Sequence, residues 1–170
     1  MNKRTLRKII SILAVVVWMI IIFSFSAQPD TESSAISGHV SYRIVETWNQ
    51  VFHLEHDAAE MEQIAEAIEY PVRKCAHMSE YGVLALLFLQ LLAAFGIRKK
   101  RAVIALMLTA AYAATDEFHQ LFVPGRAGKV TDVLIDSTGA LIALLAIEGI
   151  LYYHKTKSKK RKRCFCGRIG

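Results

Sequence analysis

The chain has 170 residues, of which 54% are hydrophobic and 21% charged, and its formal net charge is +6. It is more apolar than an ordinary soluble domain, although its charged fraction is normal. Because the basic residues gather at the ends of apolar segments, the positive charge does not indicate a nucleic-acid partner. The chain has three cysteines, and the Cys164-x-Cys166 pair is too small for a tetrahedral metal site, so no metal is expected at these cysteines.

Four apolar stretches predict an all-α, polytopic membrane protein with four transmembrane helices in a single domain over residues 1–170. A bilayer core about 30 Å thick needs roughly 17–25 helical residues. The third stretch reaches this length only if it includes the polar residues that follow Ala114. The predicted spans cover about residues 9–25, 76–97, 102–120 and 133–153.

The basic residues predict the orientation of these spans. Most of the 21 lysines and arginines lie at residues 3–8, 98–101 and 155–168. With four spans, all three blocks fall on one side of the membrane, which the positive-inside rule assigns to the cytoplasm. We therefore expect both termini in the cytoplasm, with a basic cytoplasmic tail at residues 154–170. We also expect an extracytoplasmic region at residues 26–70.

This outward region is predicted to be helical and amphipathic. Its apolar residues recur every four positions, at Ile36, Val40, Ile44 and Trp48. Such a helix suits the lipid headgroup layer or can pack over the bundle as a lid. A second short helix is expected from its cap at Asp57 to about Glu69. Pro71 then fits the first turn of the next membrane helix.

Three of the predicted spans carry ionisable residues at their outer ends. Helical spacing places Arg73, His77 and Tyr81 on one stripe. A turn at Pro124-Gly125 would direct Arg126 over the same region. The predicted cluster comprises Arg73, His77, Glu80 and Tyr81 from the second span, Asp116, Glu117, His119 and Gln120 from the third, Arg126 from the turn, and Asp132 and Asp136 from the fourth.

These residue types favour a site for an anionic lipid headgroup or a phosphate-bearing cell-wall precursor. An arginine fork binds phosphate or carboxylate through paired hydrogen bonds, which predicts that Arg73 and Arg126 hold the anionic group. A histidine held by a carboxylate can transfer protons. The candidate catalytic set is His77, His119, Glu80, Asp116 and Glu117, and the candidate ligand-binding set is Arg73, Arg126, Gln120, Tyr81, Asp132 and Asp136.

Two other functional hypotheses remain open, as does the question of whether the chain is an enzyme. His77-x-x-Glu80 and Asp116-Glu117-x-His119 place possible metal ligands one turn apart, a partial match to the di-metal centres of some four-helix proteins. In a metal-dependent membrane enzyme these residues would bind the ion. Alternatively, the charges neutralise one another in a structural network of a non-catalytic scaffold. Neither the cofactor nor the oligomeric state is readable from the sequence.

Two motifs resemble those of the VanZ-like membrane proteins. The first is Arg73-Lys74-x-Ala76-His77-x-x-Glu80-Tyr81-x-x-Leu84, and the second begins at Asp116 and runs through Pro124-Gly125-Arg126 to Asp132-Val133 and Gly139. The Phe25-Ser26-x-Gln28-Pro29 turn is also similar. One departure is Asp136, where the family often has asparagine. The resemblance implies a Gram-positive bacterial envelope protein, and the family's named member is associated with low-level resistance to teicoplanin-type lipoglycopeptides.

Overall fold

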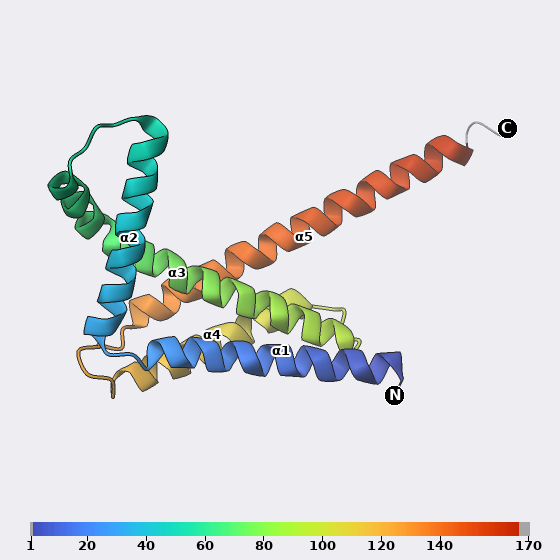
Figure 1. Ribbon diagram of the computed structural model, residues 1–170. Coiled ribbons are helices and arrows are strands. Elements are labelled where there is room, and N and C mark those ends of the chain that lie inside the picture. The colour runs from blue at the N-terminus through green and yellow to red at the C-terminus, as the bar shows by residue number, and fades with distance from the viewer. Residues whose placement is uncertain (1, 167–170) are drawn as a thin grey trace.

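The computed structural model describes the backbone of residues 2–166 and the side chains of residues 2–157. Within these residues the chain is helical throughout, with short connections and no strand (Figure 1). This confirms the predicted all-α class. The helices are α1 (Lys3–Ser26), α2 (Asp30–Phe52), α3 (Ala58–Ala94), α4 (Arg101–Gln120) and α5 (Val130–Cys166).

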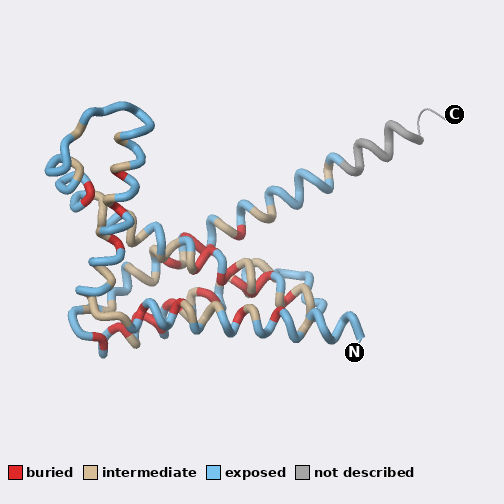
Figure 2. Tube along the Cα trace, viewed as in Figure 1, coloured by how far each residue is buried: buried red, intermediate tan, exposed pale blue. Residues whose placement is uncertain are grey.

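α3 is the central helix, because it packs against each of the other four. Its second half runs within a bundle formed with α1, α4 and α5, and its first half pairs with α2 as a hairpin that projects from one end of that bundle (Figure 1). Buried residues concentrate where the four bundle helices cross (Figure 2). The core there includes Ile22, Leu84, Ala85, Ala113 and Leu144.

Small residues allow α3 and α5 to cross closely. A methyl group added at Gly139 would overlap the backbone of Met78, and one added at Gly82 would lie 3.3 Å from the side chain of Ala143. Close backbone approach at small residues is a common means of packing membrane helices. The crossing fixes the segments of both helices that carry the predicted site residues.

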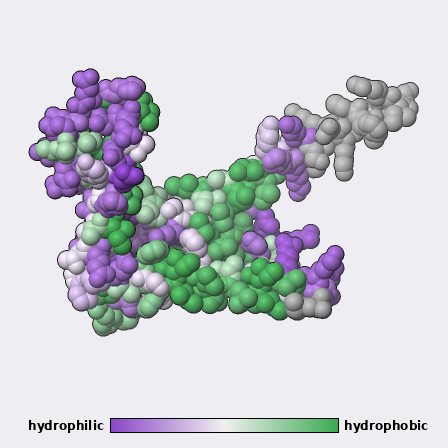
Figure 3. Space-filling model, viewed as in Figure 1, coloured by the Kyte–Doolittle hydropathy of each residue, from purple (hydrophilic) through white to green (hydrophobic). Residues whose placement is uncertain are grey.

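Three helices are long and apolar enough to cross a membrane: α1, α3 and α5. Figure 3 shows a hydrophobic band over the middle of the molecule, with hydrophilic side chains at both ends. α4 does not meet the same criterion, because polar residues occupy its last two turns, although its 20 residues extend about 30 Å. The structure therefore shows a membrane protein with three apolar helices that are long enough to span the bilayer, and α4, the fourth predicted span, is not among them.

The amphipathic helix predicted after the first span is confirmed as α2, whose apolar face is exposed at Ile36, Val40, Ile44 and Trp48. Asp57 caps α3 as predicted, and it forms a capping box with Glu60. The predicted break before Pro71 is wrong, because α3 is one helix of 37 residues that runs through this proline without interruption. A proline removes one backbone donor, and the long flanking segments, packed on α2 and the bundle, maintain the helix.

The predicted basic tail is also helical where it is described, because α5 continues to Cys166. Residues 167–170, and the side chains of Cys164 and Cys166, lie outside the described residues. The start of α1 and the end of α5 lie at one end of the molecule, whereas α2 begins at the opposite end (Figure 1). Near the first of these ends, Arg101 of α4 pairs with Glu148 of α5 at 3.1 Å.

Candidate functional site

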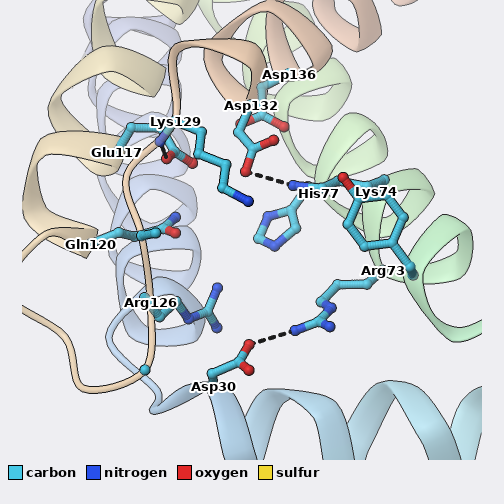
Figure 4. Close-up of a pocket in the computed structure, with 13 residues that line it drawn as sticks. Asp30, Arg73, Lys74, His77, Glu117, Gln120, Arg126, Lys129, Asp132 and Asp136 are labelled. Atoms are coloured by element: carbon cyan, nitrogen blue, oxygen red, sulfur yellow. Dashed lines mark hydrogen bonds and ion pairs between the residues drawn. The ribbon is translucent and has the colours of Figure 1, made fainter.

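A polar cavity of about 240 Å³ opens at the end of the bundle where α2 begins (Figure 4). Residues from α2, α3, α4, α5 and the α4–α5 connection converge on it, so it depends on the fold of nearly the whole chain. Its lining comprises Asp30, Tyr70, Arg73, Lys74, His77, Glu117, Gln120, Gly125, Arg126, Ala127, Lys129, Asp132 and Asp136.

Helical spacing in α3 directs two neighbouring cations to different partners. Arg73 donates to Asp30 of α2 at 2.8 Å, and its other terminal nitrogen lies 3.1 Å from Glu69, one turn earlier in α3. Lys74 pairs with Asp132 of α5 at 2.7 Å. The Arg73–Asp30 pair joins α3 to α2, and the Lys74–Asp132 pair joins α3 to α5.

A tight turn positions Arg126. The backbone N–H of Arg126 donates to the carbonyl of Val123 at 3.1 Å, with Pro124 second and Gly125 third in the turn. Gly125 has a φ of 77°, a conformation that favours glycine, and this order suits a type II turn. The turn is docked on α2, because the Pro124 carbonyl accepts from the N–H of Asp30 at 3.3 Å.

The guanidinium of Arg126 is held by backbone carbonyls. It donates to the carbonyl of Gln28 in the α1–α2 connection at 3.0 Å and to that of Phe25 in the last turn of α1 at 3.4 Å. Burial lowers the pKa of the Arg126 guanidinium from its ordinary value, and the nearby Asp30 carboxylate opposes this shift. Arginine stays charged because its ordinary pKa is above about 12. A half-buried positive charge therefore faces the cavity.

Arg126 and Lys129 both lack an acidic partner: among the described side chains, no carboxylate lies within ion-pair distance of either. Lys129 instead uses its backbone N–H, which donates to Glu117 at 2.9 Å. Figure 4 shows the side chains of Arg73, Arg126 and Lys129 extending toward the same space, with His77 between them. Of the acids in the lining, Asp30 and Asp132 are in ion pairs and Glu117 accepts a backbone N–H. The fourth, Asp136, is buried and only 4% exposed.

A buried hydrogen-bond network lies next to the cavity. Oδ2 of Asp116 accepts from Ser26 at 2.5 Å, from Tyr81 at 3.0 Å and from Gln120 at 3.3 Å. Asp116 is 3% exposed and Tyr81 is fully buried, and neither lines the cavity. The network joins α1, α3 and α4 through one carboxylate oxygen, so Asp116 holds the helices that carry the site.

Two further predicted residues also lie outside the polar cavity. His119 packs on the ring of Phe23 with centroids 4.3 Å apart, and its Nδ1 is buried without a partner among the described residues. Glu80 lies with its Oε2 3.6 Å from Nδ1 of His77, and it lines a neighbouring cavity. The structure thus brings Arg73, His77, Glu117, Gln120, Arg126, Asp132 and Asp136 together in the lining, whereas Glu80, Tyr81, Asp116 and His119 lie outside it.

The sequence reasoning missed three charged residues of the lining: Asp30, Lys74 and Lys129. Lys74 lies inside the first motif, and Asp30 directly follows the Phe25-Ser26-x-Gln28-Pro29 turn. That turn was the available signal, because Ser26 and Gln28 both bond to residues of the second motif. Lys129 had no comparable signal, since it lies in the connection between Arg126 and Asp132 and is not one of the motif residues.

The hypothesis of a metal site gains no support from the geometry. Within the described part of the chain, no three His, Cys, Asp or Glu side chains are grouped so that they could hold a metal ion. The two segments that suggested ligand pairs face different surroundings, because His119 packs on α1 while His77 faces the cavity.

The VanZ/LLP1 family model matches residues 11–152. The chain belongs to the VanZ-like family. Neither the comparison with curated proteins nor the comparison with solved structures gave a significant match. Every residue that lines the polar cavity falls inside the VanZ-like match, as do Ser26 and Asp116 of the adjacent network. The cavity is therefore built by the VanZ-like part of the chain.

Proposed function

We propose that this VanZ-like protein is a multi-pass protein of the bacterial cell envelope that binds an anionic lipid or cell-wall precursor in the polar cavity. Through this binding or a subsequent modification, it would lower susceptibility to teicoplanin-type lipoglycopeptides. The observation that carries the proposal is the half-buried guanidinium of Arg126, which faces the cavity and has only carbonyl partners among the described residues.

The charge arrangement supports an anionic ligand, although the lining contains as many acids as bases. Asp30 is paired with Arg73, Asp132 with Lys74, and Glu117 accepts a backbone N–H. The remaining donors of Arg126 and the ammonium of Lys129 are available to a phosphate or carboxylate. Because the site is partly buried, these charges act with less screening than on an open surface.

If the bound group is modified, His77 is the residue best placed for proton transfer. It lines the cavity, and the carboxylate of Glu80 lies one turn away at 3.6 Å, near enough to orient the ring after a small movement. His119 lies outside the cavity, so we assign proton transfer to His77 alone. In this proposal, Asp116 and Tyr81 stabilise the site through the adjacent hydrogen-bond network, while Gln120, Asp132 and Asp136 form part of the cavity wall.

We also propose four membrane crossings with both termini in the cytoplasm. α3 ends near the start of α1, and α5 begins at the opposite end, so α4 travels the length of the bundle (Figure 1). The basic connection at residues 98–101 and the basic end of α5 favour the cytoplasm for one end. The polar cavity then opens on the outer face, where envelope precursors are exposed, with residues 26–70 on the same side.

A susceptibility measurement tests the proposal. The protein would be expressed in a Gram-positive host, and the minimal inhibitory concentration of teicoplanin would be compared for wild type, Arg126→Gln and Arg43→Gln. Arg43 is an exposed arginine of α2 that pairs with Glu46 outside the cavity, so it is a matched control. We expect protection by wild type and Arg43→Gln, and loss of protection by Arg126→Gln at equal membrane abundance. Equal protection by all three would contradict the proposal.

A non-catalytic scaffold is the second candidate, and the Asp116 network favours it. A carboxylate that joins three helices is what a structural lock requires. The same experiment separates the two candidates. If susceptibility follows protein abundance in every variant, and never the presence of Arg126, the polar residues act as structure alone.

A further inference from the structure

A second cavity of about 200 Å³ adjoins the polar one, between the end of α1, α2 and the middle of α3. Most of its surface is apolar, from Phe25 of α1, Ile36 and Val40 of α2, and Val72 and Ala76 of α3. The polar cavity therefore has an apolar neighbour of similar size. The proposed function does not use this second space.

The two cavities meet at shared side chains. Arg73, His77 and Arg126 line both of them. Arg126 is the proposed contact for the anionic group, so an anion beside it at the boundary would have polar space on one side and apolar space on the other. An arrangement of this kind matches a molecule with a charged head and a hydrocarbon tail.

The apolar cavity is continuous with the exposed apolar face of α2. Ile36 is 51% exposed and Val40 is 45% exposed, and the same face continues through Ile44 and Trp48. An amphipathic helix with such a face suits the boundary between headgroups and acyl chains. A hydrocarbon chain that leaves the cavity along this face would enter the bilayer and would not be exposed to water.

We propose that the ligand is a lipid phosphate that occupies both cavities at once. Its phosphate lies between Arg73 and Arg126, and the first part of its hydrocarbon chain fills the apolar cavity beside α2. This inference rests on the proposed anion site and adds the class of ligand. A soluble anion would fill only the polar cavity and leave the apolar one unused.

The test measures binding to full-length protein in detergent by isothermal titration. The probes are dodecyl phosphate, inorganic phosphate and dodecanol, so that head and tail are varied separately. Ile36→Trp fills the apolar cavity, and Ile44→Trp places the same side chain two turns further along α2, outside both cavities. Arg126→Gln removes the charge. Size-exclusion profiles and melting temperatures establish that each variant is folded.

We expect wild type to bind dodecyl phosphate at least tenfold more tightly than inorganic phosphate, with dodecanol binding weakly. Ile36→Trp should weaken dodecyl phosphate binding about tenfold and leave inorganic phosphate binding unchanged, whereas Ile44→Trp should match wild type. Arg126→Gln should weaken binding of both phosphates. Replacing dodecyl phosphate by a polyprenyl phosphate or by phosphatidylglycerol in nanodiscs then identifies the source of the lipid phosphate.

Two outcomes would overturn the inference and are distinguishable from each other. If the two phosphates bind equally and Ile36→Trp has no effect, the tail site is wrong and the anion site stands. If folded wild type binds neither phosphate, the anion site itself is wrong and the lipid inference falls with it.

Discussion

Ser26, the last residue of α1, donates a 2.5 Å hydrogen bond to the carboxylate of Asp116 in α4. Both residues are buried, and the same oxygen accepts from Tyr81 of α3. The bond therefore connects the turn that leads into α2 with the helix that leads to Arg126. Because Gln120 both bonds to Asp116 and lines the cavity, the geometry of the site depends on this contact.

Replacing Ser26 by alanine should lower stability. The loss of a hydrogen bond to a buried carboxylate costs about 1.5–3 kcal/mol. For a chain of this length, each kcal/mol lowers the melting temperature by about 2–4 °C. Thermal unfolding in detergent measures the change. Ser24→Ala is the control, because Ser24 is exposed and bonds only within α1, and equal melting of the two variants would argue against the network.

Gly139→Ala should destabilise the bundle, because the added methyl group overlaps the backbone of Met78. Overpacking of this kind typically costs about 1–3 kcal/mol. Gly149→Ala in the same helix has open space around it and should be neutral or slightly stabilising, since alanine favours helices by about 1 kcal/mol over glycine. Thermal unfolding of the two variants side by side checks the close crossing of α3 and α5. A neutral Gly139→Ala would show that the helices are further apart.

Asp30→Asn should strengthen anion binding. Asp30 pairs with one terminal nitrogen of Arg73 at 2.8 Å, and the substitution removes this charge and frees that nitrogen for the ligand, while Glu69 still holds the other and the shape of the side chain is preserved. Asp30 is half exposed, so we expect a gain of about threefold to tenfold, at most about 1.4 kcal/mol. Titration with dodecyl phosphate at low and high salt measures it. Asp57→Asn is the control, since Asn also caps helices and Asp57 lies outside the cavity; weaker binding by Asp30→Asn would contradict the predicted sign.

The proposed orientation predicts which connections face outward. In a cysteine-free background, Glu60→Cys should react with a membrane-impermeant thiol reagent in intact cells. Lys99→Cys, in the basic connection between α3 and α4, should react only after permeabilisation. Gel-shift labelling distinguishes the two. Labelling of Lys99→Cys but not Glu60→Cys in intact cells would reverse the topology.

The helical class and the convergence at one end were predictable because both follow from local pattern. Apolar length predicts a span, and i, i+4 spacing places Arg73 and His77 on one stripe. The continuity of α3 through Pro71 was not predictable, because packing of both flanks outweighs the loss of one backbone donor. Here tertiary contacts, rather than local propensity, decide where the helix begins.

The division of the predicted cluster into cavity and network also required the structure. Asp116 and Glu117 are adjacent in the sequence, but Glu117 lines the cavity, whereas Asp116 lies outside the lining and accepts a hydrogen bond from Ser26. Successive residues of a helix face different directions, and their surroundings depend on which helix packs against each face. The sequence could not show that α1 would cover His119 and Asp116 while the cavity opened beside Glu117.

The most direct test of the anion site is to identify and quantify the lipid that copurifies with the protein. Wild type, Arg126→Gln and Arg43→Gln would be extracted into nanodiscs and their bound lipids quantified by native mass spectrometry. The proposed site predicts a phosphate-bearing lipid retained by wild type and Arg43→Gln, and depleted at least tenfold in folded Arg126→Gln. An identical set of lipids in all three proteins, or none in wild type, would contradict a lipid phosphate held by Arg126.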